Sequence, residues 1–100
     1  MSEADLPAVV TLTRPVQVLD AQVTSLELRE PNGLDLSECG LPLRFLSGGR
    51  TEIDTKAMSA MIARLAKVPI TAVHSLRMAD WNACAAVVAG FLHAGAGPIS

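Results

Sequence analysis

Tyrosine is absent from this 100-residue chain, and Trp81, Phe45 and Phe91 are its only aromatic residues. Surfaces that stack nucleic-acid bases or work as antibody-type paratopes depend on aromatic side chains, so both are disfavoured. Positive charge is also sparse, because the eight Lys and Arg residues are scattered and the net charge is −2. We therefore expect no nucleic-acid partner, and a core built from Ala, Val, Leu and Met.

Cysteine is scarce as well. Cys39 and Cys84 have neither the spacing of a metal site nor the density of a disulfide scaffold, which predicts small buried thiols in a reducing compartment. The first five residues are acidic and lack the basic-then-apolar order of a signal peptide. The longest fully apolar run, residues 83–92, is shorter than the about 20 residues that span a bilayer. These features predict a cytoplasmic protein without membrane contact.

No constellation of residues indicates catalysis. His74 and His93 are the only histidines, and neither has a Cys or a carboxylate at ligand spacing. The Ser-Gly-Gly-Arg segment 47–50 lacks the strand-then-helix context and the following Lys-Ser/Thr of a phosphate-binding loop. The carboxylates are spread over expected turns and helix ends. We predict a non-enzymatic protein with no cofactor and no metal.

Alternation of apolar and polar residues predicts an N-terminal antiparallel β-hairpin over residues 8–29. Pro15 cannot donate a ladder hydrogen bond, so the first strand is expected to be an edge strand or to bulge there. A lone hairpin is marginal in water, so its apolar face has to pack on helices, which gives an α+β fold. The residues expected to face the core are Val10, Leu12, Val16, Val18, Leu26 and Leu28.

The middle of the chain, residues 30–53, is predicted to be a corner followed by an irregular segment. Asn32 can cap a short helix over residues 33–38, with Asp35 near its positive end and Gly40 after its last residue. Pro and Gly punctuate the rest, and residues 47–50 are expected to be its most flexible part.

The helical part, residues 54–93, is predicted to be a small bundle of two longer helices and one or two short ones. The first long helix spans about 55–68, is capped by Asp54 or Thr55 and stops at Pro69. Thr71 can cap a single turn before the last helix, about 78–92, which has Asp80 in its first turn. Residues 8–93 thus form one domain, with flexible ends at 1–7 and 94–100.

The last helix lacks charge: no Asp, Glu, Lys or Arg follows Asp80. A helix that is apolar all round must be covered on more than one side, and so short a chain has few layers for this. A second copy or a client protein is the expected cover. The methionines of the first long helix are either core or an adaptable client surface. The residues predicted to self-associate or bind a partner are Met58, Met61, Trp81, Val88, Phe91 and Leu92.

Four segments of the sequence resemble a known family. Residues 28–36, L-R-E-P-N-G-L-D-L, are similar to the "L-R-E-P-T-x-x-D-L" signature of phage tail assembly chaperones, the Mu-like and related myophage tail assembly proteins. Residues 63–69 resemble the family's "I-A-R-L-T-G-L-P", 76–81 its "L-x-x-x-D-Y/W", and 88–92 its closing "V-x-G-F-L". The four occur in the family's order and together span most of residues 9–92.

The resemblance implies a protein that helps to build a contractile phage or prophage tail and is absent from the finished virion. Its implied partner is the tape measure protein, which such chaperones protect before tube subunits polymerise around it. Further implied partners are the tail tube protein, a longer frameshifted form of the same chain, and other copies in a homo-oligomer. The alternative is a small structural subunit of the tail, a tube or completion protein that polymerises through an open hairpin edge.

The signature segment itself allows two interpretations. It is either a second partner contact or a strand-to-helix corner held by Pro31 and the Asn32 cap. The residues concerned are Leu28, Arg29, Glu30, Pro31, Asp35 and Leu36.

Overall fold

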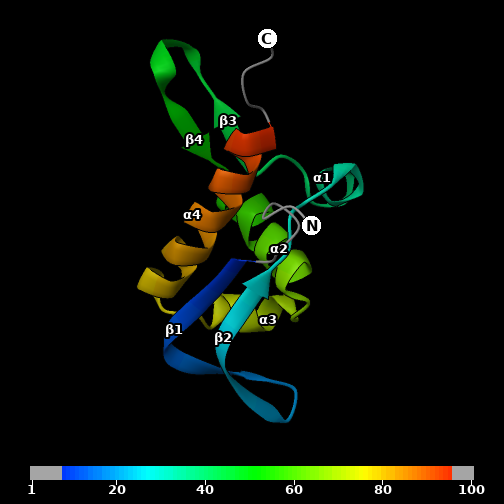
Figure 1. The fold of residues 1–100 in the computed structure, drawn as a ribbon, viewed down its shortest axis with the longest axis vertical. Helices are drawn as coiled ribbons and strands as arrows, with labels where there is room; N and C mark the ends of the chain where they lie inside the picture. Colours follow the sequence, from blue (N-terminus) through cyan, green and yellow to red (C-terminus); the bar gives the residue numbers. More distant parts are fainter. Residues whose placement is uncertain (1–7, 96–100) are drawn as a thin grey trace.

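A computed structural model describes residues 8–95 and confirms the α+β fold, with an N-terminal hairpin followed by helices (Figure 1). The expected flexible ends, 1–7 and 94–100, lie outside this range except for residues 94 and 95, which continue the last helix. In chain order the elements are β1 (Ala8–Val18), β2 (Ala21–Leu28), α1 (Gly33–Cys39), β3 (Leu43–Phe45), the 3-10 turn η2 (Ser47–Gly49), β4 (Thr51–Ile53), α2 (Thr55–Ala66), α3 (Ile70–His74) and α4 (Met78–Gly95).

The β1–β2 hairpin is antiparallel, and its register shifts between Thr11 and Val16. This bulge contains Pro15, as the sequence predicts, because proline has no N–H for the ladder. The turn is tight although it lacks glycine, since Leu19 takes a φ of +57°, in the left-handed region. The predicted inward face is confirmed, with Val18 half-buried and the other five residues buried.

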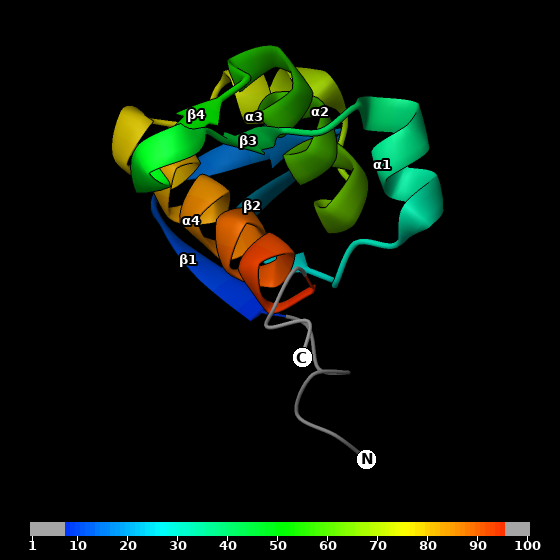
Figure 2. The same ribbon diagram turned by 90° about the horizontal axis from the view of Figure 1, so that it is seen from above.

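Helices α2 and α4 cover that buried face, as the view from above shows (Figure 2). Helix α4 contacts β1, while α2 contacts β2 and also packs against α1, α3 and α4. Each large apolar side chain that is fully buried stabilises the fold by about 1.5–3 kcal/mol relative to an exposed one. The most deeply buried apolar side chains are Leu28, Pro42, Met58, Met61, Ile62, Leu65, Val73, Cys84 and Val88.

Residues 43–53 form a second hairpin, so the prediction that this segment is irregular is wrong. Strands β3 and β4 pair antiparallel, with Leu43 opposite Ile53 and Phe45 opposite Thr51. The connecting turn places Gly48 and Gly49 at positive φ. Strands of three residues are too short to display a two-residue period, so the sequence carries no periodic signal for them. The hairpin extends beyond the helices at the end of α4, where Phe45 meets His93 edge-on (Figure 1).

The start of α2 agrees with the sequence-based prediction, whereas the end of α2 and the start of α3 differ from it. Asp54 caps α2 by accepting a hydrogen bond from the backbone N–H of Ala57 at 3.0 Å. Helix α2 ends at Ala66, before the predicted boundary. Pro69, not Thr71, precedes the first residue of α3, and no side chain caps it. Proline fits this position because its missing N–H would have no partner at a helix start.

Candidate functional site

Three of the six residues predicted to bind a partner lie in the core instead. Met58, Met61 and Val88 are each 0% exposed in the cluster between the hairpin and the helices. The hairpin supplies the cover that the sequence assigned to another polypeptide, so these three side chains offer no area to a partner. Trp81, Phe91 and Leu92 are half-buried at the margin of the same cluster, and their binding of a partner stays a prediction.

Helix α4 needs less external cover than its composition indicated. Its outward face consists largely of small side chains, with Ala79, Ala83, Ala86 and Gly90 exposed. Small side chains expose little apolar area to solvent. The expectation that this face of the helix must be covered by a second polypeptide is therefore wrong. The exception is Met78, which is 73% exposed at the start of the helix.

Met78 borders an open groove of about 720 Å³ between α2, α3 and α4. The volume falls in the range of ligand-binding clefts, and most of the lining is apolar. Trp81 crosses from α4 toward α2, and its indole Nε1 donates a hydrogen bond to Ser59 Oγ at 2.9 Å. This bond fixes the indole in the groove wall. The groove is lined by Thr55, Lys56, Ser59, Ala60, Ile70, Val73, His74, Leu76, Met78 and Trp81.

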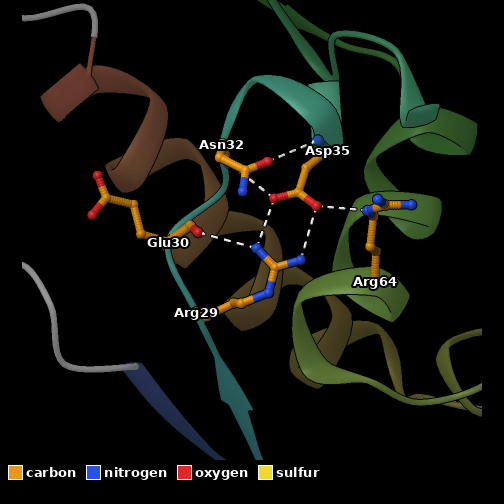
Figure 3. A network of polar contacts seen from close by, with 5 residues as sticks. All are labelled: Arg29, Glu30, Asn32, Asp35 and Arg64. Carbon is orange, nitrogen blue, oxygen red and sulfur yellow. Dashed lines mark hydrogen bonds and ion pairs between the residues drawn. The ribbon is translucent and has the colours of Figure 1, made fainter. Parts of the chain in front are cut away.

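The signature segment turns the chain from β2 into α1 through a network of charged groups (Figure 3). Arg29 donates two parallel hydrogen bonds to Asp35, from Nη1 to Oδ2 at 2.7 Å and from Nη2 to Oδ1 at 2.8 Å. Arg64 Nε, from α2, donates to Oδ1 at 2.5 Å. Asn32 and Asp35 also bond each other's backbone N–H, which completes a capping box.

Asp35 is 1% exposed, so the network ties together β2, α1 and α2 at one buried carboxylate. The hydrogen bond from Arg29, supported by the Asn32 backbone and Arg64, outweighs desolvation and holds the pKa of Asp35 well below its ordinary value. This geometry explains the acid in the signature as the centre of a structural corner. Leu28 is fully buried beside it, Pro31 and Leu36 are half-buried, and Glu30 is exposed.

Asp80 has a structural role that the sequence did not reveal. Its side chain is buried, and it accepts hydrogen bonds from the Thr13 backbone N–H at 2.9 Å and from Thr13 Oγ1 at 3.0 Å. The bond from the Thr13 backbone is the main reason that the pKa of Asp80 is lowered. The carboxylate therefore satisfies backbone that the Pro15 bulge removes from the ladder.

Cys84 is the buried cysteine of α4. Burial raises the pKa of the Cys84 thiol to about 11, which keeps it protonated and unreactive. Across residues 8–95, no group of three or more His, Cys, Asp or Glu residues is placed to hold a metal ion. None of the helices in this range combines the length and apolarity needed to cross a membrane.

A comparison with protein families identifies the family of this chain. The model of the family described as phage tail assembly chaperone proteins, E, or 41 or 14, matches residues 9–93. The chain belongs to this family. No curated protein and no solved structure matches it.

The family match confirms the resemblance and assigns this chaperone a role in the assembly of phage tails. The matched residues extend from β1 into α4 and include both the Asp35 corner and the groove. The sequence identified the corner by its motif. It missed the groove as a site, because Ser59 and Ile70 become neighbours of Trp81 only when three helices meet.

The low pKa values of Asp35 and Asp80 make the stability of this chaperone acid-sensitive. A carboxyl whose pKa is lower folded than unfolded stabilises the fold above its unfolded pKa, about 3.9. That contribution is lost as the pH falls toward the folded pKa. We expect the free energy of unfolding, measured with urea at several pH values, to be flat from pH 7 to 5 and to fall below pH 4. In an Asp35→Asn variant the decline should be shallower, and an equal decline in both proteins would contradict this origin.

Proposed function

We propose that this protein binds the tape measure protein during tail assembly and keeps it soluble without catalysing a reaction. The observation that carries the proposal is the apolar groove between α2, α3 and α4 in a member of a tail assembly chaperone family. In the groove, the large and solvent-exposed apolar side chain of Met78 borders a cleft that is large enough for the side chains of a partner. It is the proposed client site.

The physical basis is the cost of exposing apolar stripes. A long helical client that keeps such stripes in water associates with other copies, because exposed apolar patches promote aggregation. Covering them stabilises the complex by about 25 cal/mol per Å² before the losses of association are counted. A groove of modest size gives modest affinity, which permits later displacement by the tube protein.

The proposal extends to where and with whom this chaperone acts. It works in the host cytoplasm before the tail is complete and is left out of the finished virion. Self-association, contact with the tail tube protein and pairing with a longer frameshifted form are part of the same proposal. Light scattering tests the first of these, because the 10.5 kDa chain should form a larger species. Self-association is supported by exposed apolar side chains in the second hairpin and just before it, namely Leu41, Phe45, Leu46 and Ile53.

Met78→Glu is the variant that tests the client site. We expect it to weaken the capture of overlapping tape measure fragments by about tenfold or more, because a carboxylate would have to be desolvated in an apolar contact. Met78 is exposed, so the melting temperature should stay near that of the native protein. Pull-down and thermal melting measure the two effects.

Leu34→Glu is the matched control. Leu34 is 61% exposed on α1, and it is not among the residues that line the groove. It should capture the fragments as well as the native protein does. If Met78→Glu captures them equally well, the groove is not the client site.

A structural subunit of the tail is the alternative function. The β3–β4 sheet has two strands, so each keeps an outer edge to which another strand can add. Purified assembled tails separate the two functions. A chaperone should be missing from them and retained on tape measure fragments, whereas a tube or completion protein should copurify with the tails.

A further inference from the structure

The client groove has no carboxylate in its lining, although acidic residues outnumber basic ones in the chain, ten to eight. Its titratable lining residues are Lys56 and His74. The two nearest acids in the sequence are engaged elsewhere, since Asp54 caps α2 and Asp80 is buried against Thr13. Lys56 lies in the first turn of α2, where the helix end adds positive potential. A client group beside Lys56 therefore meets a cation with no acid among the lining residues.

The groove also constrains the backbone of its occupant. Its walls are mostly helical, so their backbone carbonyls bond within each helix, and N–H groups in the first turns of α2 and α3 lack an acceptor there. The Trp81 indole is already bonded to Ser59. Among the side chains that the structure describes, every buried nitrogen and oxygen atom has a hydrogen-bond partner. An extended peptide would find few acceptors there for its N–H groups, whereas an α-helix satisfies its own backbone.

We propose that the groove binds one amphipathic α-helix of the client that carries carboxylates beside its apolar stripe, with one of them facing Lys56. This inference rests on the proposed function and specifies its ligand. The apolar stripe supplies the affinity, and the carboxylate sets the orientation and the choice of segment. An exposed ion pair contributes modestly, so we expect acidic flanks to be preferred by about three- to fivefold over basic ones.

Two synthetic amphipathic peptides of about five helical turns test this inference. Both carry the same leucine stripe and no tryptophan, and they differ in having Glu or Lys in the flanking positions. Trp81 is the only tryptophan of the protein, so its fluorescence reports binding in the groove. The net charge of −2 would by itself favour the Lys peptide, so tighter binding of the Glu peptide would have to arise locally.

We expect the Glu peptide to bind more tightly at low ionic strength and the difference to shrink as salt is added. Lys56→Glu should reverse the preference without unfolding α2, since an acid suits the first turn of a helix. Arg50→Glu makes the same change in charge at an exposed residue that is not in the lining, and it should leave the preference intact.

Failure of this inference can be told apart from failure of the client site. If both peptides change Trp81 fluorescence with equal affinity, the charge preference is overturned and the groove stands. If neither peptide binds while tape measure capture still depends on Met78, the helical ligand is overturned alone. If capture is also independent of Met78, both proposals fall.

Discussion

Replacing Asp35 with alanine should lower the free energy of unfolding by about 2–3 kcal/mol. The change leaves Arg29 and Arg64 facing each other without the carboxylate that both contact, and it removes the capping box of α1. Removing one partner from a buried ion pair costs more than this in a dry interior. The arginine side chains are 38% and 34% exposed, however, so water will solvate part of their charge. Urea unfolding followed by circular dichroism measures the loss.

Glu38→Ala on the same helix is the control for this change. Glu38 is exposed, so its removal should alter the stability by less than about 0.5 kcal/mol. A double-mutant cycle of Asp35→Ala with Arg64→Ala then isolates the contact between α1 and α2, and the two losses should not add. If they add within error, that contact contributes nothing, and the corner is held by Arg29 and the cap alone.

Replacing Asp80 with alanine should lower the melting temperature by about 5–10 °C. The substitution removes the hydrogen-bond acceptor of two donors in the bulge of β1, the backbone N–H and the hydroxyl of Thr13. The loss of stability should extend from α4 into the hairpin, because Asp80 bonds a residue of β1 that lies 67 positions away in the chain. Hydrogen exchange should therefore become faster for Thr13 and its strand neighbours.

Asp20→Ala is the matched control for Asp80. Asp20 is exposed in the turn between β1 and β2, and its loss should leave both the melting temperature and the exchange at Thr13 nearly unchanged. If hydrogen exchange at Thr13 in Asp80→Ala equals that of the native protein, solvent or another group accepts the hydrogen bonds of Thr13 in place of Asp80. The carboxylate would then be dispensable.

Elements with a strong local pattern could be predicted from the sequence. The alternation from Val10 to Leu28 defines a hairpin with one apolar face, and Pro15 determines where its ladder breaks, because both effects act on neighbouring residues. The caps at Asn32 and Asp54 are equally local. The family could also be identified at this level, since its motifs are short and ordered, and the match over residues 9–93 confirms it.

The proposed client site could not be predicted from the sequence as a surface. Helical spacing places Met58, Met61 and Val88 on apolar helix faces. It does not show whether those faces pack on the hairpin of the same chain or on another protein. The position of the hairpin decides the question, and it depends on contacts between residues far apart in sequence. The second hairpin, which contains Phe45 and Ile53, could not be predicted either. Its strands of three residues are too short to show the two-residue period of a β-strand.

The sequence by itself thus determined the fold class, the bulge, the caps of α1 and α2 and the family, because each depends on residues a few positions apart. Only the tertiary structure decided the use of the two key acids. In the sequence, Asp35 and Asp80 are acids in the first turn of a helix, where they interact favourably with the helix dipole. In the structure each is buried and accepts a hydrogen bond from a residue of a distant element. It also decided that Met78 and Trp81 border a groove, since a cleft exists only where separate helices meet.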